Sequence, residues 1–186
     1  MRKVVILNSS PRRNGNSDVL SEAVAAGIRE NGGEAEKFDL AQMNINPCKG
    51  CYACQMGRGN PCVQKDDMKQ VYDAIELADA VVLATPLYWQ QMNGIMKNTI
   101  DRIFAMAGKL DRNKDTALIV SGATPGGQVY DKIESYFREA FAGPEVLGWN
   151  VASVIRAGGL GGIGDAKNSA HYESAYKLGK ELAETR

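Results

Sequence analysis

The sequence has no net charge and no long apolar run, and both absences limit what the chain can bind. Its 22 basic residues balance 22 acidic residues over 186 positions. A neutral chain lacks the excess positive charge that favours nucleic acid or an anionic membrane. The first apolar run, VVIL, is too short for a signal peptide, and no stretch approaches the length of a transmembrane helix. We therefore expect a cytoplasmic protein without nucleic-acid or membrane partners.

The length and composition are typical of one globular domain. Hydrophobic residues make up 44% of the chain and charged residues 24%, which is ordinary for a globular protein. A chain of this length can bury a substantial core. Repeats, low-complexity tracts and linkers that would divide it are lacking. We expect residues 1–186 to form a single domain.

Short apolar runs alternate with amphipathic segments along the chain. The predicted strands are 3–8, 34–40, 80–84, 116–122 and 146–156. The predicted helices are 17–31, 67–78, 92–107, 129–142 and 169–184. Helices between successive strands indicate right-handed crossovers and a parallel sheet covered on both faces. We expect an α/β fold with a doubly wound, five-stranded parallel sheet and a cysteine-containing loop, 43–65, inserted after the second strand. Ligands of such sheets bind beyond the carboxyl ends of the strands.

The loop after the first predicted strand, SSPRRNGNS at 9–17, has more special residues than a turn needs. Its hydroxyl and amide side chains can donate hydrogen bonds, its arginines are positive, and its glycine permits a positive φ. The following helix adds free N–H groups and the positive end of its dipole. The loop lacks the Walker lysine and the GxGxxG of a dinucleotide site. It predicts a cradle for a terminal phosphate; the alternative is a polar turn in which Asn16 or Ser17 caps the helix.

Two further loops at strand ends have features of a ligand site. TPLYWQQMNG, 85–94, places aromatic residues where a flat heteroaromatic ligand would need them. SGATPGGQ, 121–128, has small residues that let the backbone approach a ligand closely. The alternatives are aromatic side chains that cap the core and an ordinary flexible loop. Together with the phosphate loop, these segments favour a mononucleotide with a large planar ring, FMN rather than NAD.

All four cysteines lie within one short segment, at positions Cys48, Cys51, Cys54 and Cys62. In a reducing compartment such a group indicates metal binding or redox chemistry rather than a disulfide framework. The C-x2-C-x2-C-x7-C spacing has the tight triplet of cluster-binding ferredoxins, with a more distant fourth ligand. Four thiolates can also hold zinc, and free or reversibly oxidised thiols are the third alternative.

These segments resemble a known family. SSPRRNGNS, TPLYWQQMNGIMKNTIDR and SGATPGG are similar to loops of the flavodoxin-like NAD(P)H-dependent FMN reductases. CKGCYACQMGRGNPC further resembles the cysteine motif of the iron–sulfur flavoproteins within that group. The resemblance covers nearly the whole chain. It implies a five-stranded sheet in the order 2-1-3-4-5, bound FMN, NAD(P)H as electron donor, a 4Fe–4S cluster at the cysteines, and a homodimer or homotetramer.

The resemblance also implies residues for each part of the site. The phosphate would be held by Ser10, Arg12, Asn14, Asn16 and Ser17. The isoalloxazine ring would be lined by Pro86, Leu87, Tyr88 and Trp89, and its other edge by Ser121, Gly122, Ala123 and Gly127. The residues Lys97, Asp101 and Arg102 match the family pattern, and we interpret them as a structural ion pair that packs a helix. Because FMN itself accepts a hydride from a nicotinamide, we assign no catalytic acid, base or nucleophile to the chain.

One further segment of the sequence is rich in glycine. GLGGIG, 159–164, matches GxGxxG but begins no second βαβ unit, so we interpret it as a loop near the cofactor or the oligomer interface.

The predicted function is an FMN-dependent oxidoreductase that passes electrons to a small-molecule or protein acceptor. The alternatives are a cluster-free NAD(P)H:FMN or quinone reductase, and a flavodoxin-like electron carrier with no substrate of its own.

Overall fold

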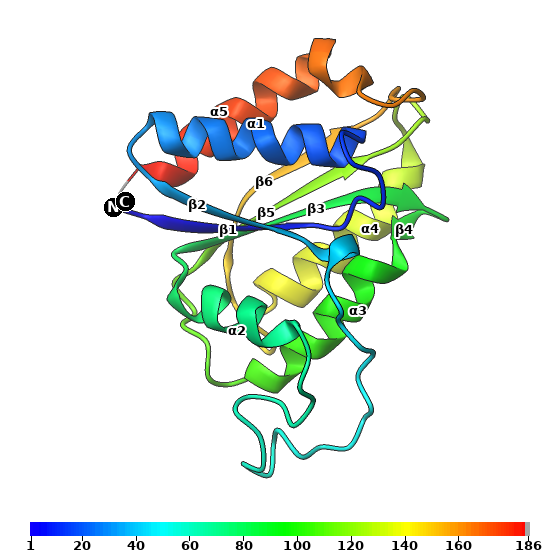
Figure 1. The fold of residues 1–186 in the computed structure, drawn as a ribbon. Helices are drawn as coiled ribbons and strands as arrows, with labels where there is room; N and C mark the ends of the chain where they lie inside the picture. The colour runs from blue at the N-terminus through cyan, green and yellow to red at the C-terminus, as the bar shows by residue number, and fades with distance from the viewer. Residues whose placement is uncertain (185–186) are drawn as a thin grey trace.

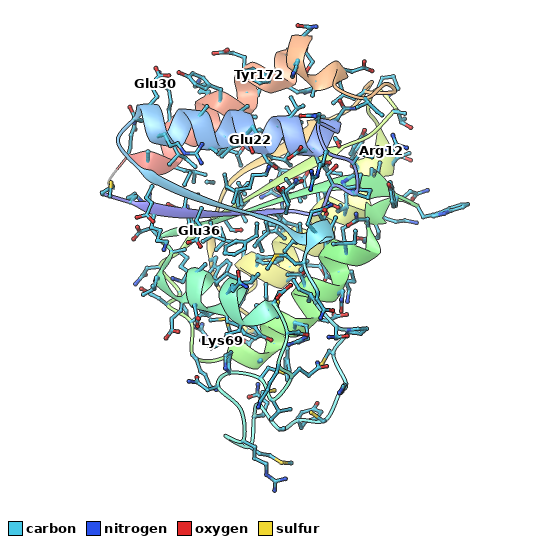
Figure 2. All side chains as sticks on the ribbon, viewed as in Figure 1. Arg12, Glu22, Glu30, Glu36, Lys69 and Tyr172 are labelled. Atoms are coloured by element: carbon cyan, nitrogen blue, oxygen red, sulfur yellow. The ribbon has the colours of Figure 1, made fainter. Side chains whose placement is uncertain are left out.

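A computed structural model describes residues 1–184 as a twisted sheet with helices on both faces (Figure 1). The strands are β1 (Lys3–Asn8), β2 (Glu34–Asp39), β3 (Ala80–Tyr88), β4 (Gln91–Met92), β5 (Asp115–Ser121) and β6 (Asn150–Ala157). The α-helices are α1 (Asn16–Glu30), α2 (Met68–Leu77), α3 (Gly94–Ile103), α4 (Asp131–Phe137) and α5 (Ala170–Ala183). Helices α1 and α5 cover one face, and α2, α3 and α4 cover the other. Figure 2 shows Glu30 and Tyr172 in the first layer and Lys69 in the second.

Short helical turns extend or precede these helices. They are η1 (Leu40–Gln42), η2 (Phe104–Met106), η3 (Gln128–Tyr130), η4 (Arg138–Ala142) and η5 (Asp165–Asn168). The predicted helix over 92–107 corresponds to α3 followed by η2, and the one over 129–142 to α4 followed by η4, a π-helical turn. Each predicted helix is present, and the differences concern its ends.

The parallel strands lie in the order β2-β1-β3-β5-β6. The prediction of an α/β fold with a parallel sheet is confirmed, but the prediction of five strands is wrong because the sheet of residues 1–184 has six. The additional strand, β4, pairs antiparallel with the end of β3 through a two-residue turn at Trp89 and Gln90. Both turn residues have positive φ, +49° and +63°. A turn of this kind matches the twist of a hairpin, and glycine or asparagine would have been its usual sequence signal.

The sheet buries side chains on both faces because its strands alternate between two helical layers. In β1, Val4 and Ile6 belong to the core under α1 and α5, whereas Val5 and Leu7 belong to the core under α2, α3 and α4. All four are fully buried. This near-continuous apolar run is typical of a parallel strand covered on both sides.

Helices α1 and α5 approach each other closely at two glycines. A Cβ atom at Gly27 would lie 2.1 Å from the carbonyl oxygen of Tyr176, and one at Gly179 would lie 2.1 Å from that of Val24. Real Cβ atoms do not come this near to backbone atoms, so the two helices pack through their backbones. Glycine is required at both positions by this contact.

The four cysteines lie in the segment between η1 and α2, and residues 43–67 form neither helix nor strand. In Figure 1 this segment is the cyan loop below α2 and α3. The N–H of Asn44 donates to the carboxylate of Asp67 at 2.7 Å, and the N–H of Asn46 donates to that of Asp66 at 3.0 Å. The two ends of the segment are therefore tied to each other.

No helix within residues 1–184 is long and apolar enough to span a bilayer.

Candidate functional site

One cavity of about 240 Å³ opens where the loops after β1, β3 and β5 meet. Ten of the thirteen residues predicted for the cofactor line it: Ser10, Arg12, Asn16, Ser17, Pro86, Leu87, Tyr88, Ser121, Gly122 and Ala123. The structure thus brings together all three loops that the sequence singled out. Pro11, Gly15, Leu160, Gly161 and Ile163 complete the lining. The last three belong to the glycine-rich segment GLGGIG, which therefore lies beside the loops after β1, β3 and β5.

Three predicted residues lie outside the cavity lining. Asn14 has a positive φ of +57°, and its N–H donates to Asp18 Oδ2 at 2.8 Å. Trp89 is fully exposed at the tip of the β3–β4 turn. Gly127 precedes η3 with φ +91°, several residues beyond the part of its loop that reaches the cavity. In each case the local turn carries the side chain or backbone away from the cavity.

Helix α1 begins beside this cavity without a side-chain cap. Its N-cap residue is Gly15, and within the described chain no side chain accepts a hydrogen bond as its cap. The interpretation of Asn16 or Ser17 as the cap is therefore wrong. Gly15 is required by close packing, because a Cβ there would lie 2.8 Å from Ser10 Oγ. The first N–H groups of a helix have no partners within the helix, so this end of α1 can bind an anion.

The side chain of Asn16 makes three hydrogen bonds to the glycine-rich segment and the turn that follows it. Its Nδ2 donates to the carbonyl oxygens of Leu160 and Gly162, at 3.3 and 2.9 Å, and its Oδ1 accepts the N–H of Ala166 at 3.1 Å. These contacts span about 150 positions of sequence. Asn16 therefore holds the glycine-rich segment against the cavity, and the spacing of the sequence motif gave no signal for this contact.

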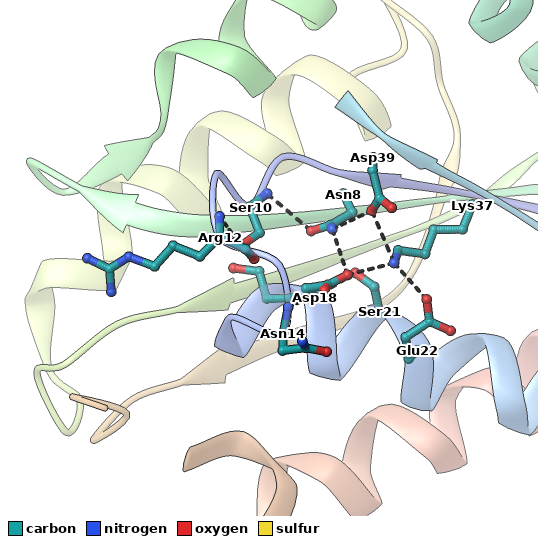
Figure 3. A network of polar contacts seen from close by, with 10 residues as sticks. Asn8, Ser10, Arg12, Asn14, Asp18, Ser21, Glu22, Lys37 and Asp39 are labelled. Atoms are coloured by element: carbon teal, nitrogen blue, oxygen red, sulfur yellow. Dashed lines mark hydrogen bonds and ion pairs between the residues drawn. The ribbon is translucent and has the colours of Figure 1, made fainter. Parts of the chain in front are cut away.

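A network of charged groups supports the loop from behind (Figure 3). Lys37 Nζ lies 2.6 Å from Asp18 Oδ1, 2.6 Å from Glu22 Oε1 and 3.0 Å from Asp39 Oδ1. Burial alone would lower the pKa of Lys37, but hydrogen bonds from its ammonium group to the three carboxylates outweigh burial and raise that pKa. Asn8 joins the network by donating to Asp18 and Asp39, so both β1 and β2 are fixed to α1.

The same network reaches the phosphate loop through two backbone groups. Asn8 Oδ1 accepts the N–H of Ser10 at 3.2 Å, and Asp18 Oδ2 accepts the N–H of Asn14 at 2.8 Å. Figure 3 shows Arg12 extending away from the network, on the opposite side of the loop from Lys37. The loop is thus held by its backbone, which leaves the Arg12 guanidinium exposed and able to meet a ligand.

Asn93 connects the first loop to the second. Its Oδ1 accepts the N–H of Met96 at 3.1 Å and caps α3, while its Nδ2 donates to the carbonyl oxygen of Ser9 at 2.7 Å. Both Asn93 and Ser9 are buried. The N-terminus of α3 is therefore anchored to the end of β1, and this contact joins the first loop to the second.

The opposite end of α3 is anchored to the cysteine segment by Arg102. Its guanidinium forms a two-point ion pair with Asp66, at 2.6 and 3.1 Å, and donates to the carbonyl oxygen of Asn46 at 2.7 Å. Both charged side chains are 1% exposed. Burial raises the pKa of Asp66, but the hydrogen bonds from Arg102 outweigh this and lower that pKa to about 2. The predicted pair of Lys97 and Asp101 is present on the surface of α3, whereas Arg102 has a separate, buried partner.

A second cavity, of about 230 Å³, is lined by all four cysteines together with Arg102. Each of these cysteines is a free thiol; Cys48 and Cys51 are exposed, and Cys54 and Cys62 are partly buried. Over residues 1–184, no three histidine, cysteine or acidic side chains gather closely enough to hold one metal ion. The Nε atom of Arg102 is buried and lacks a hydrogen-bond partner among residues 1–184. The thiols therefore surround a shared space rather than a single point.

The parallel strand order and the three loops at the carboxyl ends of β1, β3 and β5 define a doubly wound fold of the flavodoxin type. The family model described as NADPH-dependent FMN reductase matches residues 2–152. The chain belongs to this family, and it is an FMN-dependent, NAD(P)H-linked oxidoreductase.

Several relatives are similar to the chain in sequence, among them two iron–sulfur flavoproteins. An iron–sulfur flavoprotein of Archaeoglobus fulgidus is 39% identical over 131 residues, which cover 69% of this chain and 63% of that protein. An iron–sulfur flavoprotein of Methanocaldococcus jannaschii is 32% identical over 189 residues, which cover 98% of this chain and 96% of that protein. The second match extends over nearly the full length of both proteins.

Several solved structures share the fold, among them a quinone oxidoreductase and an azoreductase. An NAD(P)H:quinone oxidoreductase from Methanothermobacter marburgensis has a TM-score of 0.76 and 20% identity, and the match covers 100% of this chain and 98% of that one. An FMN-dependent NADH-azoreductase from Bacillus anthracis, in complex with FMN, has a TM-score of 0.71 and 15% identity, with 98% and 100% covered. At these identities the likeness concerns the fold alone.

Proposed function

We propose that FMN binds in the cavity at the carboxyl ends of β1, β3 and β5, with its phosphate at the N-terminus of α1. The observation that carries this proposal is the uncapped start of α1 beside Ser10, Arg12 and Ser17. The helix end supplies free N–H groups and a positive dipole end, and Arg12 supplies a positive charge. A phosphate monoester needs this combination, and a neutral ligand does not.

The ring of FMN would lie between the loops after β3 and β5. Pro86, Leu87 and Tyr88 line one side, and Ser121, Gly122 and Ala123 line the other. Bound FMN supplies hydride transfer from a nicotinamide. Within residues 1–184, no carboxylate, histidine or lysine lines this cavity. The chain would bind and orient the reactants, and the polar side chains that line the cavity are Ser10, Arg12, Asn16, Ser17, Tyr88 and Ser121.

The test of the flavin site is to identify the flavin that copurifies with the protein and to titrate the flavin-free protein with FMN and with riboflavin. FMN should bind at least tenfold more tightly than riboflavin, because only FMN has the phosphate. Equal affinities would contradict the placement of the phosphate at α1. If neither flavin bound, the whole proposal would be wrong.

The four cysteines would hold a 4Fe–4S cluster, which supplies one-electron transfer. In such a group each iron takes one thiolate, so the four sulfurs surround the group instead of meeting at one ion. A single zinc ion would need all its thiolates within about 2.3 Å of one point. The thiols line one cavity but no three of them converge within residues 1–184, which favours a cluster over zinc. Helix α3 is about 15 Å long, given its ten residues, and its last turn lines the cysteine cavity through Asp101 and Arg102.

The four cysteines are free thiols, and the second candidate is a cluster-free NAD(P)H:FMN or quinone reductase in which they stay so. Iron and acid-labile sulfide analysis of anaerobically purified protein separates the two. About four irons and four sulfides per chain would support the cluster, and none after reconstitution would favour the second candidate. Oxidation of NADH or NADPH by the protein would argue against a carrier without a substrate of its own.

Further proposals concern the location, domain organisation, oligomeric state and electron acceptor of the protein. We propose a cytoplasmic, single-domain subunit of a homodimer or homotetramer, with a small molecule or a protein as electron acceptor. Exposed large apolar side chains support an oligomer or a docking partner: Tyr52, Phe104 and Val146 lie at or near the cysteine cavity, and Tyr88 and Trp89 lie at or near the flavin cavity. Light scattering would measure the oligomeric state. A steady-state assay with different electron acceptors would show which of them the protein reduces.

A further inference from the structure

Arg102 has two structural contacts that explain its burial. Its Nη atoms reach the carboxylate of Asp66 and the carbonyl oxygen of Asn46. Asn46 precedes the first cysteine and Asp66 follows the last, so Arg102 holds both ends of the cysteine segment against α3. These contacts provide hydrogen-bond partners for both Nη groups of the guanidinium.

The Nε–H of Arg102 takes no part in that clamp. It is buried and, in the described residues, has no hydrogen-bond partner. A buried donor without a partner is costly. Such groups are few in native proteins, and strain, a redox role or a bound water or ion explains them. Arg102 lines the cavity that all four cysteines share. The unpaired donor and the four thiols thus belong to residues that line one cavity.

We propose that the Nε–H of Arg102 donates a hydrogen bond to a sulfur atom of the iron–sulfur group held by the four cysteines and raises the reduction potential of that group. This inference rests on the proposed cluster. Arg102 acts here as a positioning and tuning residue, because it touches the group without being one of its ligands.

The direction of the effect follows from charge. The group becomes more negative when it gains an electron, so a donor to its sulfur stabilises the reduced state more than the oxidised state. Hydrogen bonds to the sulfurs are among the determinants of such potentials. The positive charge of Arg102 is already opposed by the carboxylate of Asp66 at 2.6 Å. The N–H donor is therefore the part of Arg102 expected to set the potential.

Two matched double variants separate the donor from the clamp. Both contain Asp66→Asn, which avoids an unpaired buried carboxylate. Arg102→Gln places an amide N–H near the position of Nε, whereas Arg102→Met has a similar length and no donor. The control is Lys97→Met, which removes an exposed cation from the same helix. Each chain is reconstituted with ferrous iron and sulfide, analysed for both, and titrated for the midpoint potential of the iron–sulfur group.

We expect the Gln variant to keep a potential near that of the parent chain, the Met variant to have a more negative potential, and the Lys97 control to be unchanged. Equal potentials for the Gln and Met variants would assign Arg102 a structural role alone and overturn the inference. Loss of iron from both variants alike would have the same meaning. A parent chain that takes up no iron or sulfide would overturn the proposed cluster itself together with this inference, and the iron analysis identifies that case.

Discussion

The hydroxyl oxygens of Ser17 and Ser121 lie 2.7 Å apart and are both buried. Ser17 is in the first turn of α1, and Ser121 is the last residue of β5. Their hydrogen bond joins two of the three loops that line the flavin cavity. The loop for the phosphate and the loop for the ring are thereby held at a fixed separation.

Replacing Ser17 with alanine should lower the affinity for FMN about tenfold, because it removes a hydroxyl from the phosphate end and leaves Ser121 unpaired, at a cost of about 1–3 kcal/mol. The affinity for riboflavin should change less. Fluorescence titration of the flavin-free variant with both ligands measures the difference. Ser21→Ala is the control, since Ser21 is buried one turn later and donates to the carbonyl of Ser17 outside the cavity. Equal losses for FMN and riboflavin would count against a phosphate contact.

Replacing Arg12 with glutamine should weaken FMN retention without a measurable loss of stability, because Arg12 is exposed and lines the cavity. We expect a loss of about 3- to 30-fold, since a hydrogen bond to a charged group contributes about 1.5–3 kcal/mol at most sites and less in water. Added salt should reduce the affinity of the parent chain and have less effect on the variant. Arg13→Gln is the matched control, being exposed but outside the cavity lining. The same loss in both variants would indicate a general charge effect.

The depressed pKa of Asp66 predicts a loss of stability in acid. Its pKa falls from 3.8 to about 2 in the folded chain, so the folded state favours the carboxylate. The resulting stabilisation is complete above pH 3.8 and is lost as the pH falls from there through about 2. Its size is about 2 kcal/mol, from 1.36 kcal/mol per pKa unit. Urea unfolding at several pH values measures it.

Asp66→Asn should remove this pH dependence and lower the free energy of unfolding at neutral pH by about 3–5 kcal/mol, because Arg102 then becomes an unpaired buried charge. Asp73→Asn is the control, since Asp73 pairs with Lys69 on the exposed face of α2 and such pairs contribute about 0.5 kcal/mol or less. If the two variants had equal stability, the buried pair would not have the role assigned to it.

Replacing Gly27 with alanine should destabilise the fold by about 1–3 kcal/mol, because the added methyl group forces the backbones of α1 and α5 apart. Gly94→Ala is the control: nothing lies within 4 Å of a Cβ at Gly94, and alanine favours a helix by about 1 kcal/mol over glycine. Thermal unfolding compares the two. A neutral effect at Gly27 would mean that the helices are free to separate.

The sequence predicted those parts of the fold and site that depend on local pattern. Apolar runs such as VVIL and the helices between them determine a parallel sheet, whose strand ends place their loops together. The β3–β4 hairpin escaped prediction because Trp89 and Gln90 occupy positions that usually hold glycine or asparagine. The pairing of Arg102 with Asp66 also escaped, since the two residues are 36 positions apart and meet only through the packing of α3 on the cysteine segment. Likewise, no local pattern indicates that Asn16 holds the glycine-rich segment.

A crystal structure of the protein with bound FMN would show where the cofactor lies. We expect the phosphate at the N–H groups of Asn16 and Ser17, within reach of Arg12, and the ring between Leu87 and Ala123. FMN with its phosphate away from the start of α1, or bound in the cavity of the four cysteines, would show that the proposed placement is wrong.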